Sequence, residues 1–344
     1  MTDRSSVDHL DEQLLADYLA LKVPGFIGPV TATKFSGGQS NPTFRLTTIN
    51  KSYVLRRQPP GKLLKSAHAV DREYKVLAAL ENSGVPVAKV YHLCEDTSLI
   101  GSMFYIMEYV EGRVFWNSAL PDIDSPATRG QMYQNMVEVL AALHSVDVEK
   151  VGLSDYGKPG NYYERQFSRW SKQYKLSETH DIPEMDQLIA WLEKHLPEDD
   201  GKVSLVHGDY RMDNLMFHPT KPAIVAVLDW ELSTLGHPYA DLAYQCMQLR
   251  LPENVGKATG LGGIDRAPLG IPEEQEYVDA YCKLVGIDKI DNWNFYLAFS
   301  FFRLAAIAQG VAKRAEEGNA SNKEAQAVGA IVKPLAQYAL KLTK

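Results

Sequence analysis

Apolar positions recur at two different periods in the first 110 residues. Five stretches alternate between apolar and polar side chains as strands do, and two repeat at the spacing of a helix. The strands are predicted at residues 29–35, 43–49, 52–57, 87–94 and 103–110, and the helices at residues 8–21 and 67–82. Short strands that follow one another through tight turns predict an antiparallel sheet.

Beyond Gly112 the pattern becomes mainly helical, interrupted only by short β-like runs within residues 203–230. The helices are predicted at residues 126–147, 160–175, 184–196, 238–250, 273–285, 291–317 and 322–342. We therefore predict an α+β chain with a small antiparallel-sheet lobe at residues 1–110 and a large, mainly helical lobe at residues 111–344. This order of elements is typical of the two-lobed protein kinase-like fold.

Composition excludes several classes of protein. The formal net charge of -7 argues against nucleic-acid binding, which needs a basic surface to neutralise phosphates. The three cysteines are far apart and never form a CxxC pair, so we expect neither a disulfide framework nor a thiolate zinc site. The first residues lack an apolar signal segment, and no run of about 18 apolar residues occurs, so we expect no membrane partner and a cytoplasmic location. The oligomeric state stays open.

The candidate chemistry gathers in the part of the large lobe that is not helical. Three short apolar runs predict buried strands, at residues 203–206, 214–217 and 224–228. Asp209 and Asn214 follow the order Asp-x-x-x-x-Asn after the first run, and Asp229 follows the third. This is the spacing of a kinase catalytic loop and its later metal-binding aspartate.

Phosphoryl transfer explains these residue types, because it requires an acceptor hydroxyl aimed in line and a triphosphate whose charge is neutralised. We assign Asp209 as the base that accepts or orients the hydroxyl proton, and Arg211 as a side chain within reach of the transferred group. Asn214 and Asp229 supply the hard oxygen ligands that Mg²⁺ prefers. His207 is assigned to structural support of the loop. A tight turn is the structural alternative for the His-Gly-Asp sequence, and the ordered set as a whole favours the functional interpretation.

A nucleotide clamp is predicted in the N-terminal lobe. Ser36, Gly37 and Gly38 lie between two predicted strands, where a glycine turn lets backbone N–H groups approach phosphates. The sequence is not Gly-x-Gly-x-x-Gly, and a simple hairpin turn is the alternative. Alternation along the third predicted strand puts Arg56 on the face that carries lysine in kinases. We predict that Arg56 binds ATP phosphates and pairs with Glu73 on the next helix; a surface helix of mixed charge is the alternative for Glu73.

The last strand of the small lobe ends in a predicted hinge. Residues 107–112 (MEYVEG) occupy the position where a kinase offers backbone groups to adenine. We expect the carbonyl group of Glu108 and the amide group of Val110 to make these contacts.

Several motifs together resemble one family. They are HGDYRMDN at residues 207–214, LDWE at 228–231, GHPYADLA at 236–243, FSGGQSNPTF at 35–44 and LRRQPPG at 55–61. These are similar to the aminoglycoside phosphotransferase / choline kinase superfamily. Within it, the likeness is greatest to the phosphotransferase-like domain fused to acyl-CoA dehydrogenases and to its free-standing bacterial relatives. It covers roughly residues 25–315.

The resemblance implies an ATP- and Mg²⁺-dependent O-phosphotransferase that acts on the hydroxyl group of a small molecule. It implies a base at Asp209, metal ligands at Asn214 and Asp229, and structural support of the catalytic loop by Asp241. Arg56 stands where aminoglycoside kinases carry lysine, as it does in the fused subgroup. The fused subgroup favours a hydroxyacyl-CoA or a hydroxy acid as acceptor.

Other functions stay open alongside this one. A protein kinase is disfavoured because only residues 230–236 separate Asp229 from the next predicted helix, which leaves no long segment for docking a peptide. A nucleotide-binding pseudokinase is disfavoured by the intact set of Asp209, Asn214 and Asp229. A two-metal hydrolase would need a further His/Asp cluster. An aminoglycoside-type antibiotic kinase would need a carboxylate cluster for a polycation.

The acceptor site has only weak candidates in the sequence. The loop at residues 251–271, with Arg250 before it, could line or cover the site, since long loops in compact domains are often functional. Weaker candidates lie on the predicted 160–175 helix, and a basic residue, Arg303, stands among aromatic residues of the 291–317 helix. The loop and helix candidates are Lys257, Asp265, Arg266, Tyr162, Tyr163 and Arg165.

Overall fold

The small lobe is built on one antiparallel sheet. The computed structural model describes residues 10–35, 41–59, 68–252, 259–317 and 328–344. Five strands pair in the order β1-β2-β3-β5-β4. They are β1 (Thr31–Lys34), β2 (Thr43–Thr47), β3 (Ser52–Arg57), β4 (Val90–Cys94) and β5 (Phe104–Glu108). The predicted sheet is confirmed, and β3 has the predicted bounds.

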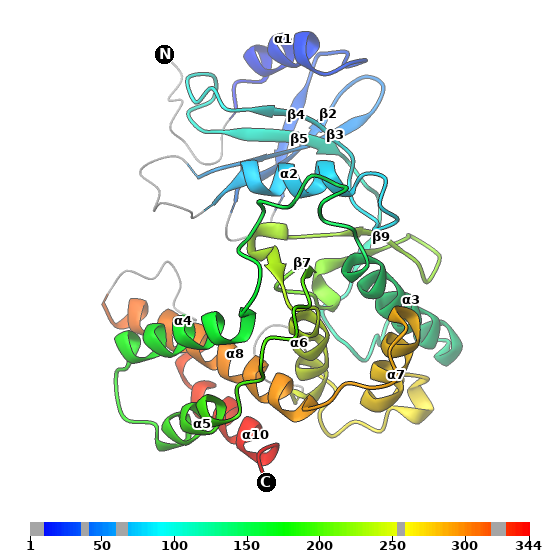
Figure 1. Ribbon diagram of the computed structural model, residues 1–344. Helices are drawn as coiled ribbons and strands as arrows, with labels where there is room; N and C mark the ends of the chain where they lie inside the picture. The colour runs from blue at the N-terminus through cyan, green and yellow to red at the C-terminus, as the bar shows by residue number, and fades with distance from the viewer. Residues whose placement is uncertain (1–9, 36–40, 60–67, 253–258, 318–327) are drawn as a thin grey trace.

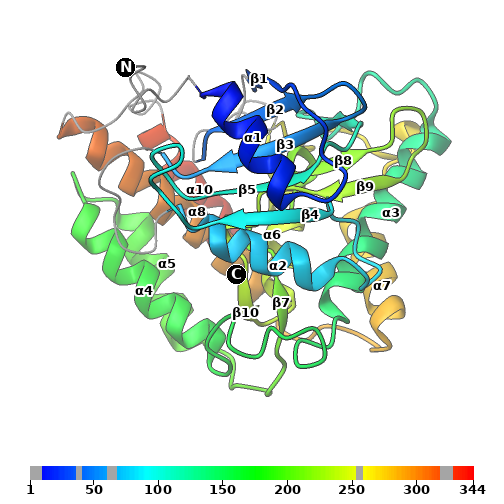
Figure 2. The ribbon, with the colours of Figure 1, turned by 90° about the horizontal axis from the view of Figure 1, so that it is seen from above.

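Two helices pack against this sheet. α1 (Glu12–Lys22) buries Leu15 and Leu19 in a cluster with the strand residues Phe44 and Leu55. Figure 2, which looks down on the small lobe, shows α1 lying across the strands. α2 (Val70–Leu80) contacts β4 and β5, and Figure 1 shows it between the sheet and the large lobe. The side chains of α2 therefore reach the boundary between the lobes.

Alternation along β3 sends two neighbouring arginines in opposite directions. Arg57 is 1% exposed, and its guanidinium donates to the carbonyl of Ile100 at 3.3 Å within the small lobe. Arg56 reaches toward α2 and the large lobe instead. Strand pairing fixes this register, with Arg56 opposite Thr43 on β2 and Tyr105 on β5. The predicted orientation of Arg56 is confirmed.

Helices make up most of the large lobe (Figure 1). They are α3 (Pro126–His144), α4 (Tyr162–Ser177), α5 (Pro183–Lys194), α6 (Tyr239–Arg250), α7 (Glu274–Val285), α8 (Trp293–Glu316) and α10 (Val332–Lys341). Their apolar faces form one buried cluster, which also includes Val76 and Leu77 of α2. The α+β, kinase-like organisation with a small sheet lobe and a large helical lobe is confirmed. The boundary between residues 110 and 111 stays a prediction.

Five short strands lie around the predicted catalytic segment. β6 (Arg113–Val114), β8 (Leu215–Phe217) and β9 (Ile224–Val227) form one sheet, and β7 (Ser204–Val206) pairs with β10 (Thr234–Gly236). β7, β8 and β9 were predicted, whereas β6 and β10 were missed. β6 has only two residues, too few to show an alternating pattern, and β10 lies within residues 230–236, to which the sequence analysis assigned no element.

The C-terminal helix is shorter than predicted. Within the predicted span of residues 322–342, a turn occupies residues 330–331, and α10 begins only at Val332. Gly329 precedes this turn, and glycine is a poor residue for continuing a helix. Residues 322–327 lie outside the described residues.

α8 is long and apolar enough to cross a membrane by length and composition alone. However, 83% of its most apolar window is buried inside the fold. α4, α6 and α10 all pack against it. These contacts are those of a core helix, so its hydropathy is weak evidence for a membrane span.

Tyr156 fastens α2 to the large lobe. Its buried hydroxyl donates to the carbonyl of Arg72 at 3.2 Å and contacts Oγ of Ser233 at 2.7 Å. In return, the Arg72 guanidinium lies over the Tyr156 ring and donates to the carbonyls of Tyr156 (2.8 Å) and Ser233 (3.3 Å). Ser233 also donates to the carbonyl of Trp230. Because Trp230 directly follows Asp229, these contacts hold α2 against the turn that carries this aspartate.

We predict that Tyr156→Phe lowers the free energy of unfolding by about 1–2 kcal/mol, because it removes two buried hydrogen-bond contacts and leaves partners unsatisfied. Urea unfolding measures the change. Tyr74→Phe, on the half-buried side of α2, is the control and should change stability by less than about 0.5 kcal/mol. Equal stability of Tyr156→Phe and the wild type would mean that these contacts do not hold the lobes together.

Candidate active site

A buried carboxylate organises the loop at residues 207–214, which follows β7. Oδ2 of Asp241, on α6, accepts the backbone N–H of His207 at 2.6 Å, and Oδ1 accepts that of Gly208 at 2.7 Å. Gly208 has φ +86°, and a Cβ there would lie 2.7 Å from the carbonyl oxygen of Leu232. The backbone turn therefore requires glycine, and Asp241 satisfies its two buried donors.

The ionised form of Asp241 is favoured by its partners. Burial raises the pKa of this carboxyl, but His144 and the N–H of Gly208 outweigh burial and hold the pKa below its ordinary value. His144 Nε2 lies 3.4 Å from Oδ2 of Asp241, and its Nδ1 contacts the hydroxyl of Tyr281, on α7, at 2.7 Å. Three helices of the large lobe thus meet behind the 207–214 loop.

Asp209 is fixed by the residue five positions later. Nδ2 of Asn214 donates to both the carbonyl oxygen and Oδ2 of Asp209, each at 2.9 Å. Arg211 Nε lies 3.4 Å from the same Oδ2, while Arg211 Nη2 lies 3.0 Å from Oδ2 of Asp213. The side chain of Asp209 keeps 19% of its surface exposed, so it is both positioned and reachable.

Asp213 is a carboxylate that the sequence analysis missed. It is buried beside Arg211, and burial raises the pKa of Asp213 although the Arg211 charge lowers it in part. Its Oδ1 has no hydrogen-bond partner among the described residues. The sequence does contain a signal, because Asp213 directly precedes Asn214 in the motif.

Asp229 lies in a left-handed turn next to the 207–214 loop. Its φ is 62°, which redirects the chain at the end of β9. Two bonds tie this turn to the 207–214 loop: Leu228 N–H donates to the carbonyl of Asn214 at 2.8 Å, and His207 Nε2 contacts the carbonyl of Leu228 at 2.8 Å. The structural assignment of His207 fits these contacts.

Arg56 joins Asp229 to the small lobe. Its Nε lies 2.7 Å from Oε2 of Glu73, and its Nη2 lies 2.9 Å from Oδ1 of Asp229. Burial disfavours the charged guanidinium, but the carboxylates of Glu73 and Asp229 outweigh burial and raise the pKa of Arg56. The predicted pairing of Arg56 with Glu73 is confirmed, whereas its contact with Asp229 was not foreseen.

Glu73 has further partners on both sides. It accepts from Nδ2 of Asn41 at 2.8 Å and from the hydroxyl of Tyr105 at 3.0 Å. The sequence analysis missed both, although strand pairing puts Tyr105 directly opposite Arg56. With only 2% of Glu73 exposed, this is a buried carboxylate with every oxygen in use, and not a residue of a mixed surface helix.

The predicted hinge leaves the N–H of Val110 without a described backbone bond. The N–H of Glu108 donates to the carbonyl of Lys89 at 2.7 Å, and no described backbone bond engages the N–H of Val110. Gly112 lets the chain approach β8 closely, since a Cβ there would lie 2.6 Å from the carbonyl of Phe217. The predicted phosphate-binding residues Ser36, Gly37 and Gly38 lie outside the described residues.

Most acceptor-site candidates in the large lobe have structural roles. Arg250 pairs with Glu274, and buried Arg266 donates to the carbonyls of Leu249 and Pro272. Arg165 donates to backbone carbonyls of the preceding turn. Tyr162 and Tyr163 are buried in aromatic contacts. Asp265 caps the backbone N–H of Ala267, and Lys257 lies outside the described residues. The described side chains among them make local packing and hydrogen-bonding contacts, and their place in an acceptor site stays a prediction.

The residues present fit a divalent cation. Asn214 uses its amide nitrogen for Asp209, which leaves its oxygen as the ligand atom. The Asp229 side chain is 38% exposed and already attracts a positive group, the guanidinium of Arg56. In the described part of the chain, no group of three or more His, Cys, Asp or Glu side chains is placed to hold a metal ion.

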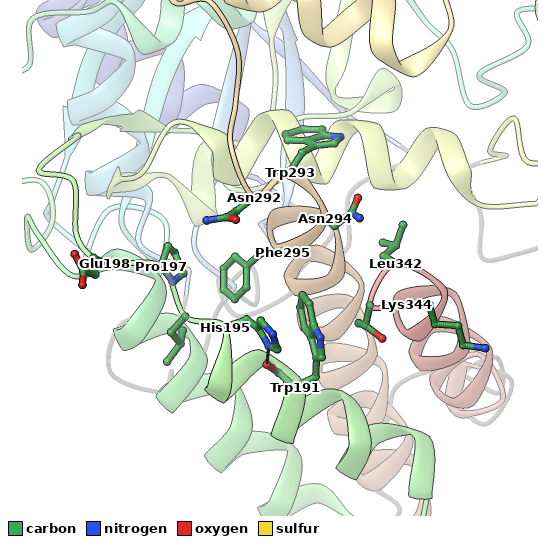
Figure 3. Close-up of a pocket in the computed structure, with 12 residues that line it drawn as sticks. Trp191, His195, Pro197, Glu198, Asn292, Trp293, Asn294, Phe295, Leu342 and Lys344 are labelled. Carbon is green, nitrogen blue, oxygen red and sulfur yellow. Dashed lines mark hydrogen bonds between the residues drawn. The ribbon is translucent and has the colours of Figure 1, made fainter.

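Figure 3 shows a cavity of about 710 Å³, and the site residues Asp209, Asn214 and Asp229 are not among those that line it. It opens beside the start of α8, where Trp191, His195, Asn292 and Phe295 surround it. His195 contacts the carbonyl of Trp191 at 2.7 Å. Volume alone does not make a reaction site, so the convergent polar groups of the 207–214 loop define the candidate.

Comparison with known proteins agrees with this geometry. The model of the phosphotransferase enzyme family matches residues 31–276. A crystal structure from Ralstonia eutropha, of a protein provisionally described as an aminoglycoside phosphotransferase, is 49% identical with a TM-score of 0.90, over 97% of this chain and 98% of that one. Acyl-CoA dehydrogenase family member 10 of Mus musculus is 48% identical over 91% of this chain. The chain spans only 29% of that relative's length.

More distant structures share the fold alone. Spectinomycin phosphotransferase, solved with ADP and spectinomycin, is 13% identical with a TM-score of 0.64, over 97% of this chain and 98% of that one. Choline kinase from Cryptosporidium parvum is 12% identical with a TM-score of 0.64, over 96% of this chain and 95% of that one.

We predict that Asp241→Asn destabilises the protein by about 2–4 kcal/mol at pH 7, because the amide turns an NH₂ group toward one of two buried N–H donors. The folded state depresses the pKa of Asp241, so its contribution is complete above the unfolded pKa of about 3.9 and is lost as the pH falls through the folded value. Urea unfolding of both proteins at pH 7 and at lower pH should show the difference shrinking in acid. Asp288→Asn, on an exposed loop, is the control; a pH-independent difference would contradict the assignment of the charge.

Proposed function

The chain belongs to the phosphotransferase enzyme family, and we propose that it transfers the γ-phosphoryl group of ATP, with Mg²⁺, to a hydroxyl group of a small molecule. The observation that carries the proposal is the convergence of Asp209, Asn214 and Asp229. Asn214 bonds to the carboxylate of Asp209, and its carbonyl accepts the N–H of Leu228, the residue before Asp229. Proton acceptor and metal ligands thus share one hydrogen-bonded unit.

Asp209 is the proposed base. Its carboxylate accepts the proton of the acceptor hydroxyl as the new O–P bond forms, while the bond between the γ-phosphorus and the β,γ-bridging oxygen breaks and ADP leaves. The Asn214 amide holds the carboxylate in place. Arg211, 3.4 Å from Asp209, supplies positive charge beside the transferred phosphoryl group.

Asn214 and Asp229 are the proposed ligands of Mg²⁺. When bound, Mg²⁺ neutralises the oxygens of the β- and γ-phosphates. The amide oxygen of Asn214 and the part-exposed carboxylate of Asp229 are the hard donors that such an ion needs. In this proposal the carboxylate of Asp229 gives up its contact with the Arg56 guanidinium when it serves as a metal ligand.

The nucleotide lies between the lobes in this proposal. Arg56, oriented by Glu73, binds phosphate oxygens, and its two-nitrogen fork can hold a carboxylate and a phosphate together. The glycine turn with Ser36, Gly37 and Gly38 is the proposed cover of the phosphates. The carbonyl of Glu108 and the amide of Val110 are the proposed adenine contacts. The ADP complex of spectinomycin phosphotransferase, which shares the fold, supports nucleotide binding by this chain.

We infer a hydroxyacyl-CoA or a hydroxy acid as the acceptor, supported by the likeness to acyl-CoA dehydrogenase family proteins. Because the chain spans less than half of those relatives, their complete activity does not pass to it directly. An aminoglycoside acceptor is the second candidate, favoured by the Ralstonia eutropha structure. A pseudokinase without turnover is a third, to which the unforeseen Arg56–Asp229 contact lends some support. Three free, buried cysteines suit the cytoplasm, where we place the protein.

A side-by-side screen of acceptors tests the proposal. We expect ATP consumption with hydroxyacyl-CoA compounds or hydroxy acids, and none with kanamycin, choline or sugars. Asp209→Asn should lower turnover by about 10²–10⁴-fold while Mg·ATP affinity changes little, because the base contacts the acceptor and not the metal. Near wild-type turnover in Asp209→Asn would contradict the assigned base, and turnover of kanamycin alone would favour an antibiotic kinase.

Removal of the Asp229 carboxylate tests the metal assignment. We predict that Asp229→Ala abolishes the Mg²⁺-dependent part of ATP binding, because no carboxylate then neutralises the bridged phosphates. Calorimetry with ATP, in Mg²⁺ and in EDTA, measures it. Asp186→Ala, which removes an exposed carboxylate paired with Lys175, is the control and should bind like the wild type. Unchanged Mg·ATP affinity in Asp229→Ala would place the metal elsewhere.

A further inference from the structure

Arg303, on α8, stands beside the proposed base. Its Nη2 donates to the carbonyl of Gly208 at 2.8 Å, one residue before Asp209. Its guanidinium lies 5.8 Å from the ring centre of Trp170, on α4, and 5.5 Å from that of Tyr244, on α6. Burial and the neighbouring Asp209 carboxylate raise the pKa of Tyr244, so the ring that flanks Arg303 also faces the base. Side chains of three helices, α4, α6 and α8, thus meet beside the 207–214 loop.

The Arg303 charge has no counter-charge within the described residues. No described carboxylate lies within ion-pair distance of it, and its Nε is buried without a hydrogen-bond acceptor. Buried donors and unpaired charges are costly to a folded protein. The Nε atoms of Arg56 and Arg211 also have no hydrogen-bond acceptor of good geometry, but each of these two guanidinium groups lies within ion-pair distance of two carboxylates.

A second guanidinium lies on the same aromatic ring. Arg169 is exposed and stands 5.2 Å from the centre of the Trp170 ring, again without a carboxylate partner among the described residues. Burial raises the pKa of Tyr162, on α4; the charges of Arg303, Arg165 and Arg169 lower it, and that of Asp241 raises it. Arg303 and Arg169 both lie against the Trp170 ring, so positive charge gathers there in a protein whose net charge is -7.

We propose that Arg303 binds an oxyanion group of the phosphoryl acceptor, with Arg169 at the rim of the same subsite. The inference rests on the proposed function and adds a residue that determines specificity. The acceptor then carries a carboxylate or a phosphate near its reactive hydroxyl, and its apolar part lies along Trp170. Nη2 of Arg303 already donates to the carbonyl of Gly208, and the rest of its guanidinium group supplies the directed donors that planar oxyanions select.

The same geometry disfavours a polycationic acceptor. An ammonium group placed near Asp209 would meet Arg211 and Arg303 together, and like charges in a partly dry site repel strongly. A purely structural role for Arg303 would need only its contacts with Gly208 and the two rings. Arg113, on β6, has that simpler pattern: it lies over Phe115 at 5.3 Å and donates to the carbonyl of His218 at 3.1 Å. Arg113→Met is therefore a matched control.

The test compares hydroxyl compounds that carry an anionic group with a neutral one that does not. Wild type, Arg303→Met, Arg303→Lys and Arg113→Met are first saturated with Mg·AMP-PNP, and calorimetry should give the same nucleotide affinity for all four within about twofold. Ligand-observed NMR titrations then follow 3-hydroxybutyrate, 3-hydroxybutyryl-CoA and the neutral analogue butane-1,3-diol. Kanamycin is the cationic comparison.

We expect the wild type and Arg113→Met to bind at least one anionic compound and neither butane-1,3-diol nor kanamycin. Arg303→Met should weaken that binding by about 10–100-fold, and Arg303→Lys should restore part of it, because charge remains but the fork is lost. Equal binding of the neutral compound, tight binding of kanamycin, no anionic binder, or unchanged affinity in Arg303→Met would each overturn the inference. Failure of the wild type to bind Mg·AMP-PNP would instead contradict the proposed function on which it rests.

Discussion

The ion network centred on Arg56 is the constraint on which the rest of the site depends. A guanidinium that is largely removed from water is stable only with carboxylates around it, and Arg56 finds one on α2 and one on the turn after β9. This requires the register of β3, the inward position of α2 and the left-handed turn at Asp229 at the same time. The Tyr156 contacts hold α2 in the position that makes the network possible. The candidate site is thus assembled from residues of both lobes.

The loop that carries the proposed base depends in a similar way on a buried carboxylate, that of Asp241. Asp241 takes up two backbone donors that no regular element could satisfy, and it thereby fixes the direction in which Asp209 leaves the turn. Asn214 then binds Asp209 and retains an oxygen for a metal. Arg303 adds a cation from the opposite side through the carbonyl of Gly208. The proposed base, one proposed metal ligand and the proposed acceptor-binding arginine therefore all depend on one short loop.

The sequence was sufficient to predict the residues that follow a local spacing pattern. It was insufficient to predict the residues that are brought together only by tertiary contacts. The order of Asp209, Asn214 and Asp229 and the alternation around Arg56 are local patterns, and the structure brings these residues together as expected. The partners of Glu73 come from distant segments, Asn41 and Tyr105, and no local pattern announces them. Strands of two or three residues, such as β6 and β10, are held by their neighbours and not by their own side chains. Charged residues of the acceptor loop, such as Arg266, were indistinguishable from ligand-binding residues until their burial was known.

The central claim is that this site moves a phosphoryl group from ATP to a carbon-bound hydroxyl. The direct measurement is ³¹P NMR of Mg·ATP incubated with the protein and a hydroxyacyl-CoA. The account predicts that each ATP lost gives one ADP and one new phosphate-ester resonance, and that inorganic phosphate forms no faster than in a sample without acceptor. Loss of ATP to inorganic phosphate alone, or bound ATP that is never consumed with any hydroxyl compound offered, would contradict it.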